Sequence, residues 1–136
     1  MTPVPKKIII VEDQLEVADL LEEMLNIDPY KVIKIHSSGG ALSMIRAEKP
    51  DVVLLDIMMP DVNGLEVLRY MRREPSLQKT PVVIVSAKTL PADIRAGLEA
   101  GATAYLTKPV DIQKLRKTVA AVIPVEENPD VSHHHN

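Results

Sequence analysis

Five short runs of β-branched and aliphatic residues recur along the chain, and each is followed by a stretch in which apolar residues have helical spacing. The runs predict strands at 7–11, 31–35, 51–55, 81–85 and 104–106. The stretches predict helices at about 15–25, 40–48, 65–71, 92–100 and 112–122. Because a parallel connection needs a crossover long enough to hold a helix, this strict alternation predicts an α/β fold with a parallel sheet covered on both faces.

The predicted strands differ in polarity, and this difference indicates their places in the sheet. The runs at 7–11, 51–55 and 81–85 are almost wholly apolar, as strands buried on both faces require. The run at 31–35 contains two lysines, which suit an edge strand that must resist pairing with other chains. We therefore expect a (βα)5 doubly wound sandwich of three layers, with five parallel strands in the flavodoxin-like order 2-1-3-4-5.

The length of 136 residues suits one domain, which we expect to span residues 6–123, with tails at 1–5 and 124–136. The run His133–His135 is typical of a flexible linker or a tag remnant. A net charge of −3 creates no field that would attract nucleic acid or a membrane surface. No apolar run approaches the roughly 20 residues that cross a bilayer. We expect a cytoplasmic protein with no direct nucleic-acid contact and no membrane insertion.

Residues of the kinds that carry phosphate and metal chemistry follow four of the five predicted strands. They are Glu12 and Asp13 after the first strand, Asp56 after the third, Ser86 after the fourth and Lys108 after the fifth. A single polar residue in such a place is usually a helix cap or a loop residue. In an open parallel sheet, however, ligands bind beyond the carboxyl ends of the strands, near the point where the strand order reverses. Five such residues together therefore indicate one site at that edge.

The chemistry of these five residues favours a bound cation. Three carboxylates repel each other, and Lys108 supplies only one compensating charge. We expect Mg²⁺, with Mn²⁺ as a substitute, on Asp13 and Asp56, with Glu12 acting through water. Between the metal and the ammonium group, Asp56 would attack an incoming phosphoryl group as a carboxylate nucleophile. Ser86 would then donate a hydrogen bond to a phosphoryl oxygen and sense the modification.

These residues lie in segments that resemble the receiver domains of two-component response regulators, the CheY-like superfamily. The matching segments are Glu12-Asp13, Leu54–Leu65, Val85–Ala87 and Gly101–Pro109. The resemblance covers about residues 6–123, and the ordered set of motifs is highly specific. It implies a phosphorylation-activated signalling switch whose self-catalysed phosphotransfer and slow dephosphorylation are its only enzymatic activities.

The resemblance also implies a role for each matching residue. Asp56 would accept the phosphoryl group, and Lys108 would bind the phosphate. The metal would be held by Glu12, Asp13, Asp56 and the backbone carbonyl of Met58. Ser86 and Tyr105 would be the switch residues, and the peptide bond before Pro109 would be cis. For Tyr105, a partly buried core residue remains the alternative interpretation.

The chain departs from the family pattern at several positions. Asp61 and Asn63 stand where many relatives have Gly and Asp, although Asn63 still suits a helix N-cap, and Val110 replaces a Phe. Met58 and Lys88 occupy two positions that, in this family, flank the path of attacking water. Met58 cannot orient water by strong hydrogen bonds, whereas Lys88 either reaches the phosphate or lies in solvent. We therefore expect slow to intermediate self-dephosphorylation.

The expected partners follow from the same resemblance. A sensor histidine kinase or a histidine phosphotransfer protein would supply the phosphoryl group. A downstream effector, or a second copy in a homodimer, would contact the predicted fourth helix, fifth strand and fifth helix. The cognate kinase, the output, the oligomeric state and the phosphoryl lifetime remain open. So does the choice between a stand-alone protein and a receiver excised from a multidomain regulator or hybrid kinase.

Two other classes of protein share this kind of sheet. A haloacid-dehalogenase-like phosphohydrolase also uses an Asp nucleophile and Mg²⁺, but it carries a second Asp where this chain has Met58. A flavin-binding module would need Ser, Thr and Gly donors after the first strand, where this chain has an acidic Glu12-Asp13 pair. The sequence therefore disfavours both. His36 follows the predicted edge strand without ligand partners nearby in sequence, and we interpret it as a surface or capping residue.

Overall fold

The computed structural model describes residues 4–124, in which five strands alternate with five helices. The strands are β1 (Lys7–Val11), β2 (Lys31–Ile35), β3 (Val52–Leu55), β4 (Val82–Ser86) and β5 (Ala104–Thr107). The helices are α1 (Leu15–Leu25), α2 (Ala41–Glu48), α3 (Gly64–Arg73), α4 (Pro91–Glu99) and α5 (Ile112–Val122). Every predicted element is present, with bounds shifted by no more than two residues. The predicted tails lie almost wholly outside the described residues, as does His133–His135.

All five strands form one parallel sheet in the order β2-β1-β3-β4-β5. The predicted fold class and strand order are confirmed. Strands β1, β3 and β4 are buried along almost their whole length, whereas β2 lies at the edge and is partly exposed. The strand order reverses beside β1, because the chain first adds β2 on one side and then β3 on the other.

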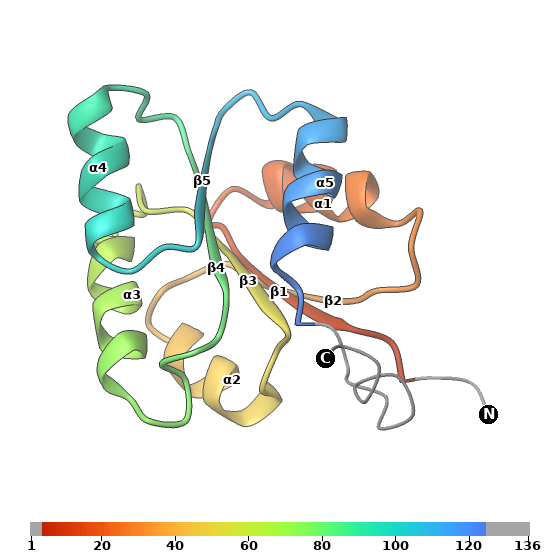
Figure 1. Ribbon diagram of the computed structural model, residues 1–136, viewed down its shortest axis with the longest axis horizontal. Coiled ribbons are helices and arrows are strands. Elements are labelled where there is room, and N and C mark those ends of the chain that lie inside the picture. The colour runs from red at the N-terminus through yellow and green to blue at the C-terminus, as the bar shows by residue number, and fades with distance from the viewer. Residues whose placement is uncertain (1–3, 125–136) are drawn as a thin grey trace, which may run out of the picture.

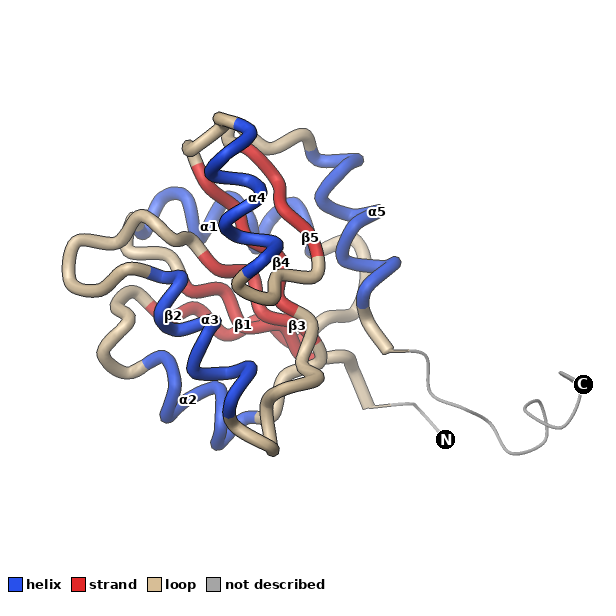
Figure 2. Tube along the Cα trace, turned by 60° about the vertical axis from the view of Figure 1, so that its left-hand side comes forward, coloured by secondary structure: helices blue, strands red, loops and turns tan. Residues whose placement is uncertain are grey.

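Helices cover both faces of the sheet, with α1 and α5 on one side and α2, α3 and α4 on the other (Figure 1; Figure 2). Successive strand residues point to opposite faces, so Ile8 and Ile9 enter different cores. Leu21 of α1 and Leu115 of α5 pack into one core, and Met71 of α3 packs into the other. Within residues 4–124, no helix combines the length and the apolarity needed to cross a bilayer.

Local sequence signals mark where α3 and α5 begin. The Asn63 side chain caps α3 by accepting a hydrogen bond of 2.9 Å from the Leu65 N–H, as expected for this residue type. Asp111 caps α5 in the same way. Two apolar residues at the starts of helices depart from the buried pattern: Leu15 of α1 is 56% exposed, and Ile112 of α5 is 39% exposed. The buried stripe of α1 therefore comprises Ala18, Leu21 and Leu25.

Replacing Arg72 by methionine is expected to lower the free energy of unfolding by about 2 kcal/mol. The Arg72 guanidinium donates to the carbonyl oxygens of Gly101 at 2.9 Å, Thr80 at 2.8 Å and Gln78 at 3.2 Å. Arg72 thus joins α3 to the loop before β4 and to the loop after α4. Methionine would leave these carbonyl groups without their hydrogen-bond donor. Urea unfolding measures the change. Arg73→Met on an exposed position is the control, and equal midpoints for both variants would refute the prediction.

Candidate functional site

Backbone hydrogen bonds extend the sheet beyond its strands and bring the predicted site residues to one edge. The Glu12 N–H donates to the Ile35 carbonyl at 2.9 Å, and the Asp56 N–H donates to the Val11 carbonyl at 3.0 Å. The Lys108 N–H donates to the Ser86 carbonyl at 2.8 Å. Each polar residue is therefore held in register with the neighbouring strand.

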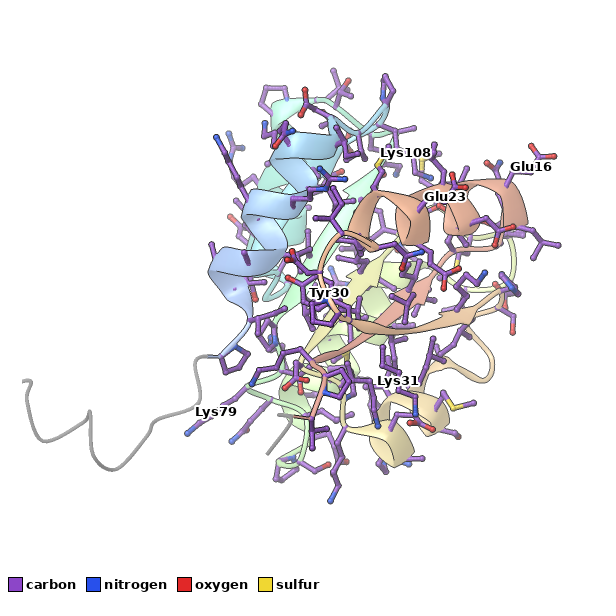
Figure 3. All side chains as sticks on the ribbon, turned by 90° about the vertical axis from the view of Figure 1, so that its right-hand side faces the viewer. Glu16, Glu23, Tyr30, Lys31, Lys79 and Lys108 are labelled. Atoms are coloured by element: carbon purple, nitrogen blue, oxygen red, sulfur yellow. The ribbon has the colours of Figure 1, made fainter. Side chains whose placement is uncertain are left out.

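An ammonium group lies between two buried carboxylates at this edge. Lys108 Nζ is 2.7 Å from Glu12 Oε1 and 3.3 Å from Asp56 Oδ2. Glu12 is only 1% exposed and Asp56 only 5% exposed. Figure 3 shows Lys108 near the top of the molecule, whereas Lys31, the first residue of β2, and Lys79, which precedes β4, lie in its lower half. One positive charge thus faces two buried negative charges.

The second oxygen of each buried carboxylate is held by a backbone N–H group. Asp56 Oδ1 accepts from the Met58 N–H at 2.9 Å, and Glu12 Oε2 accepts from the Gln14 N–H at 3.2 Å. These bonds fix the orientation of both carboxylates without neutralising their charge. Asp56 therefore presents a pre-oriented oxygen pair rather than a mobile side chain.

Asp13 completes a group of three acids that fits a divalent cation. One carboxylate oxygen from each of Glu12, Asp13 and Asp56 lies within 4.8 Å of the others. Oxygens that share one Mg²⁺ lie at most about 4 Å apart, because each is about 2 Å from the ion. Small rotations of the side chains would close this difference. The donor set, all oxygen and short of positive charge, is of the kind that hard cations prefer.

The electrostatics of the site also favour a bound cation. Burial raises the pKa of the Glu12 carboxyl above its usual value, and the charge of Asp56 adds to this effect, although Lys108 and the Gln14 N–H oppose it. Burial alone would lower the pKa of Lys108. Its hydrogen bond to Glu12 and the charge of Asp56 outweigh that effect, so the pKa of Lys108 is raised. The site therefore favours added positive charge.

Without a divalent cation, the protein is expected to lose stability as the pH rises from about 4.5 through the raised pKa of Glu12. In that range the folded state holds a proton that the unfolded state has released, so the stabilisation is complete below the ordinary pKa of 4.5 and vanishes above the folded one. Urea unfolding in EDTA at several pH values measures this slope. Glu12→Gln should have a flatter profile, and identical profiles would contradict the assignment to Glu12.

Ser86 and Tyr105 are joined through the backbone of Lys88. Ser86 is fully buried at the end of β4, and its Oγ accepts from the Lys88 N–H at 3.1 Å. The Tyr105 hydroxyl donates to the Lys88 carbonyl at 2.8 Å. Tyr105 is partly buried, and this burial raises the pKa of its hydroxyl. The two predicted switch residues are thus connected although they belong to different strands.

The two residues expected to influence phosphoryl lifetime line one open pocket. Met58 and Lys88 border a depression of about 530 Å³ together with Asp13 and Asn63. Met58 is 49% exposed, and Lys88 is also exposed. The pocket shares Asp13 with the acidic group, so it adjoins the group of three acids. The Lys108–Pro109 peptide bond is cis.

Three features of this edge were not anticipated from the sequence. His36 is exposed, as interpreted, but its Nδ1 lies 3.2 Å from the Glu12 carbonyl oxygen. Its position directly after β2, the neighbour of β1, is the signal that would have placed it there. The Asp61 carboxylate accepts from the Ser38 N–H at 3.1 Å and ties two loops together. Gly64 approaches the backbone of Asp56 so closely that no side chain fits there.

Comparisons with known proteins agree on one family. The model of the "Response regulator receiver domain" family matches residues 8–120. Protein PilH of Pseudomonas aeruginosa is 39% identical over 117 residues, which cover 86% of this chain and 97% of PilH. A putative response regulator from Chloroflexus aurantiacus superposes with a TM-score of 0.84 at 31% identity, covering 88% of this chain and 98% of that one. The Mn²⁺-bound response regulator Rcp1 superposes with a TM-score of 0.74 at 27% identity, covering 92% and 99%.

Proposed function

The chain belongs to the response regulator receiver domain family, and on this premise we propose that it is a signalling switch that accepts a phosphoryl group on Asp56. One observation carries the proposal. The Asp56 carboxylate is buried and oriented at the carboxyl edge of the sheet, beside the Lys108 ammonium and close to two further carboxylates. Such a site has the groups needed to receive a phosphoryl group and to neutralise its charge.

The acidic group would hold Mg²⁺, or Mn²⁺ in its place. Asp13, Asp56 and the backbone carbonyl of Met58 would bind the ion, and Glu12 would act through water. Bound there, the cation would supply electrostatic neutralisation of the phosphoryl oxygens. The fold similarity to Mn²⁺-bound Rcp1 supports a divalent ion of this class.

Phosphotransfer would proceed by direct displacement on phosphorus. A carboxylate oxygen of Asp56 attacks the phosphorus of a phosphohistidine in the donor protein, and an O–P bond forms as the P–N bond breaks. The bonding electrons leave with the imidazole nitrogen, which takes up a proton. Lys108 turns from Glu12 toward the new phosphoryl oxygens, and the buried Ser86 hydroxyl donates its hydrogen to one of them.

Phosphorylation would change the partner-binding surface formed by α4, β5 and α5. The Ser86 hydroxyl accepts a hydrogen bond from the Lys88 N–H, and the Tyr105 hydroxyl of β5 donates one to the Lys88 carbonyl. A movement of the Ser86 hydroxyl toward the phosphoryl group would therefore displace Lys88 and Tyr105. A sensor histidine kinase or a histidine phosphotransfer protein would supply the phosphoryl group. An effector, or a second copy of the chain, would bind the changed surface, and this exchange would take place in the cytoplasm.

Self-dephosphorylation is expected to be slow to intermediate, with a phosphoryl group that persists for longer than seconds. Met58 offers attacking water no strong hydrogen bond, and Lys88 borders the same pocket. A time course of phosphate release from the phosphorylated protein measures the rate. Lys88→Ala reports whether that ammonium group matters, since a change in rate would require it to reach the phosphate. Complete turnover within seconds would contradict the expectation.

Incubation with Mg²⁺ and acetyl phosphate tests the proposed function directly. Wild type is expected to gain the mass of one phosphoryl group, whereas Asp56→Asn gains none. A beryllofluoride complex with Mg²⁺ should shift NMR resonances of α4, β5 and α5 in wild type alone. If wild type and Asp56→Asn respond alike to both reagents, the protein is not a switch of this kind.

A further inference from the structure

Helix α4 rests on the sheet through a glycine. Of the nine described residues of α4, Gly97 alone is buried, and Leu98 on the same helix is 46% exposed. Figure 2 shows α4 running beside β5 and β4. A helix attached to the sheet by so little buried surface belongs to the least stable parts of a fold.

The Tyr105 ring occupies the space in which a side chain at position 97 would lie. A Cβ atom built on Gly97 would be 2.9 Å from Tyr105 Cδ2 and 3.0 Å from Cε2. It would also be 2.8 Å from Cδ1 of Ile84, although that flexible end of a side chain can turn away. The aromatic ring has less freedom, because its hydroxyl is bonded to the Lys88 carbonyl at 2.8 Å.

Glycine at this place has a cost that its contacts must offset. Within a helix, glycine is less favourable than alanine, because it loses more backbone freedom on folding. Its presence in the last turn of α4 therefore weakens the helix that carries part of the proposed output surface. Because position 97 has no side chain, the α4 backbone can lie close to the ring of Tyr105.

We propose that Gly97 is a positioning residue of the switch, which admits the Tyr105 ring beneath α4 and thereby holds this helix in its resting place. The chain of contacts runs from Ser86 to Lys88, from Lys88 to Tyr105 and from Tyr105 to Gly97. A side chain at position 97 forces the ring out or lifts α4 from the sheet, and either change breaks this chain. The role of Gly97 in signalling rests on the proposed function, whereas its effect on Tyr105 does not.

Fluorine NMR of protein labelled with 3-fluorotyrosine tests the placement of the ring. The chain has three tyrosines, so Tyr30 and Tyr70 serve as internal references for Tyr105. Gly97→Ala is expected to shift the Tyr105 resonance and to leave the other two unchanged. Gly39→Ala is the matched control, since a Cβ there meets nothing within 4 Å. An unchanged Tyr105 resonance in Gly97→Ala overturns the inference.

A double-mutant cycle separates the ring contact from helix propensity. In wild type, Gly97→Ala is expected to lower the urea midpoint, because the added methyl group meets the ring. In a Tyr105→Ala background the ring is gone, so the same substitution is expected to raise the midpoint through better helix propensity. Equal changes in both backgrounds overturn the inference.

Beryllofluoride with Mg²⁺ then distinguishes this inference from the proposed function. In wild type the reagent should shift the Tyr105 fluorine resonance, and in Gly97→Ala that resonance should already be displaced and respond less. If wild type does not respond, the proposed function fails while the placement of the ring by Gly97 stands. If both proteins start from the same resonance and respond equally, the inference about Gly97 fails while the proposed function stands.

Discussion

Replacing Gly64 by alanine is expected to lower the free energy of unfolding by about 3 kcal/mol, at the upper end of overpacking effects. A Cβ atom at Gly64 would be 2.6 Å from the Ile57 Cα and 2.7 Å from the Asp56 carbonyl oxygen. Both are backbone atoms, so no side-chain rotation can relieve the contact. Gly64 is buried at the start of α3, and its N–H donates to the Ile57 carbonyl at 3.2 Å. Alanine must therefore push α3 away from the segment that follows Asp56.

The same substitution should disturb the site as well as the fold. Because the contact falls on the Asp56 carbonyl itself, the Asp56 carboxylate moves with it, and phosphorylation by acetyl phosphate should slow. Urea unfolding gives the stability, and Gly39→Ala is the control because a Cβ there has open space. If Gly64→Ala unfolds at the midpoint of Gly39→Ala, the close approach does not exist.

Asp56→Asn is expected to have opposite effects on stability and on metal affinity. Without a divalent cation, the variant should be slightly more stable than wild type, because the charge of Asp56 opposes ionisation of the buried Glu12 carboxyl and its removal relieves this repulsion. The amide keeps an oxygen to accept from the Met58 N–H, so the geometry survives. Mg²⁺ affinity should fall about a hundredfold, which corresponds to about 2.7 kcal/mol.

Urea unfolding in EDTA measures the stability without a cation, and unfolding in a series of Mg²⁺ concentrations measures the affinity for the ion. A ligand that binds only the folded state raises stability as its concentration rises. Asp28→Asn, an exposed residue between α1 and β2, removes the same formal charge far from the site and is the control. Equal stabilisation by Mg²⁺ in wild type and Asp56→Asn would mean that Asp56 does not bind the ion. A gain of stability in Asp28→Asn as large as in Asp56→Asn would point to net charge instead of local crowding.

The acidic edge is thus expected to lower the stability of the protein when no cation is bound. The raised pKa of Glu12 and the two buried carboxylates near one ammonium group show a charge imbalance that a core would not retain. Sites prepared for a charged ligand often have this property, because the ligand supplies the missing charge. Both the pH profile and the metal titration therefore report on the same imbalance.

The sequence by itself determined the architecture of this protein. Alternating strand and helix signals predicted every element, and the lysines of 31–35 indicated the edge strand. It also indicated which residues share the site, because all strands of a parallel sheet end at the same edge. Asp56, Glu12 and Lys108 each follow a strand, so their proximity follows from topology without any knowledge of packing.

Only the tertiary structure decided how these residues share their charges and which small residues they depend on. Lys108 lies nearer to Glu12 than to Asp56, and Gly64 and Gly97 make room for a carbonyl group and an aromatic ring. Such contacts join segments far apart in the chain, and their distances depend on sheet twist, loop path and helix position. Periodicity records which face of an element is buried, but it carries no information on how closely two elements approach.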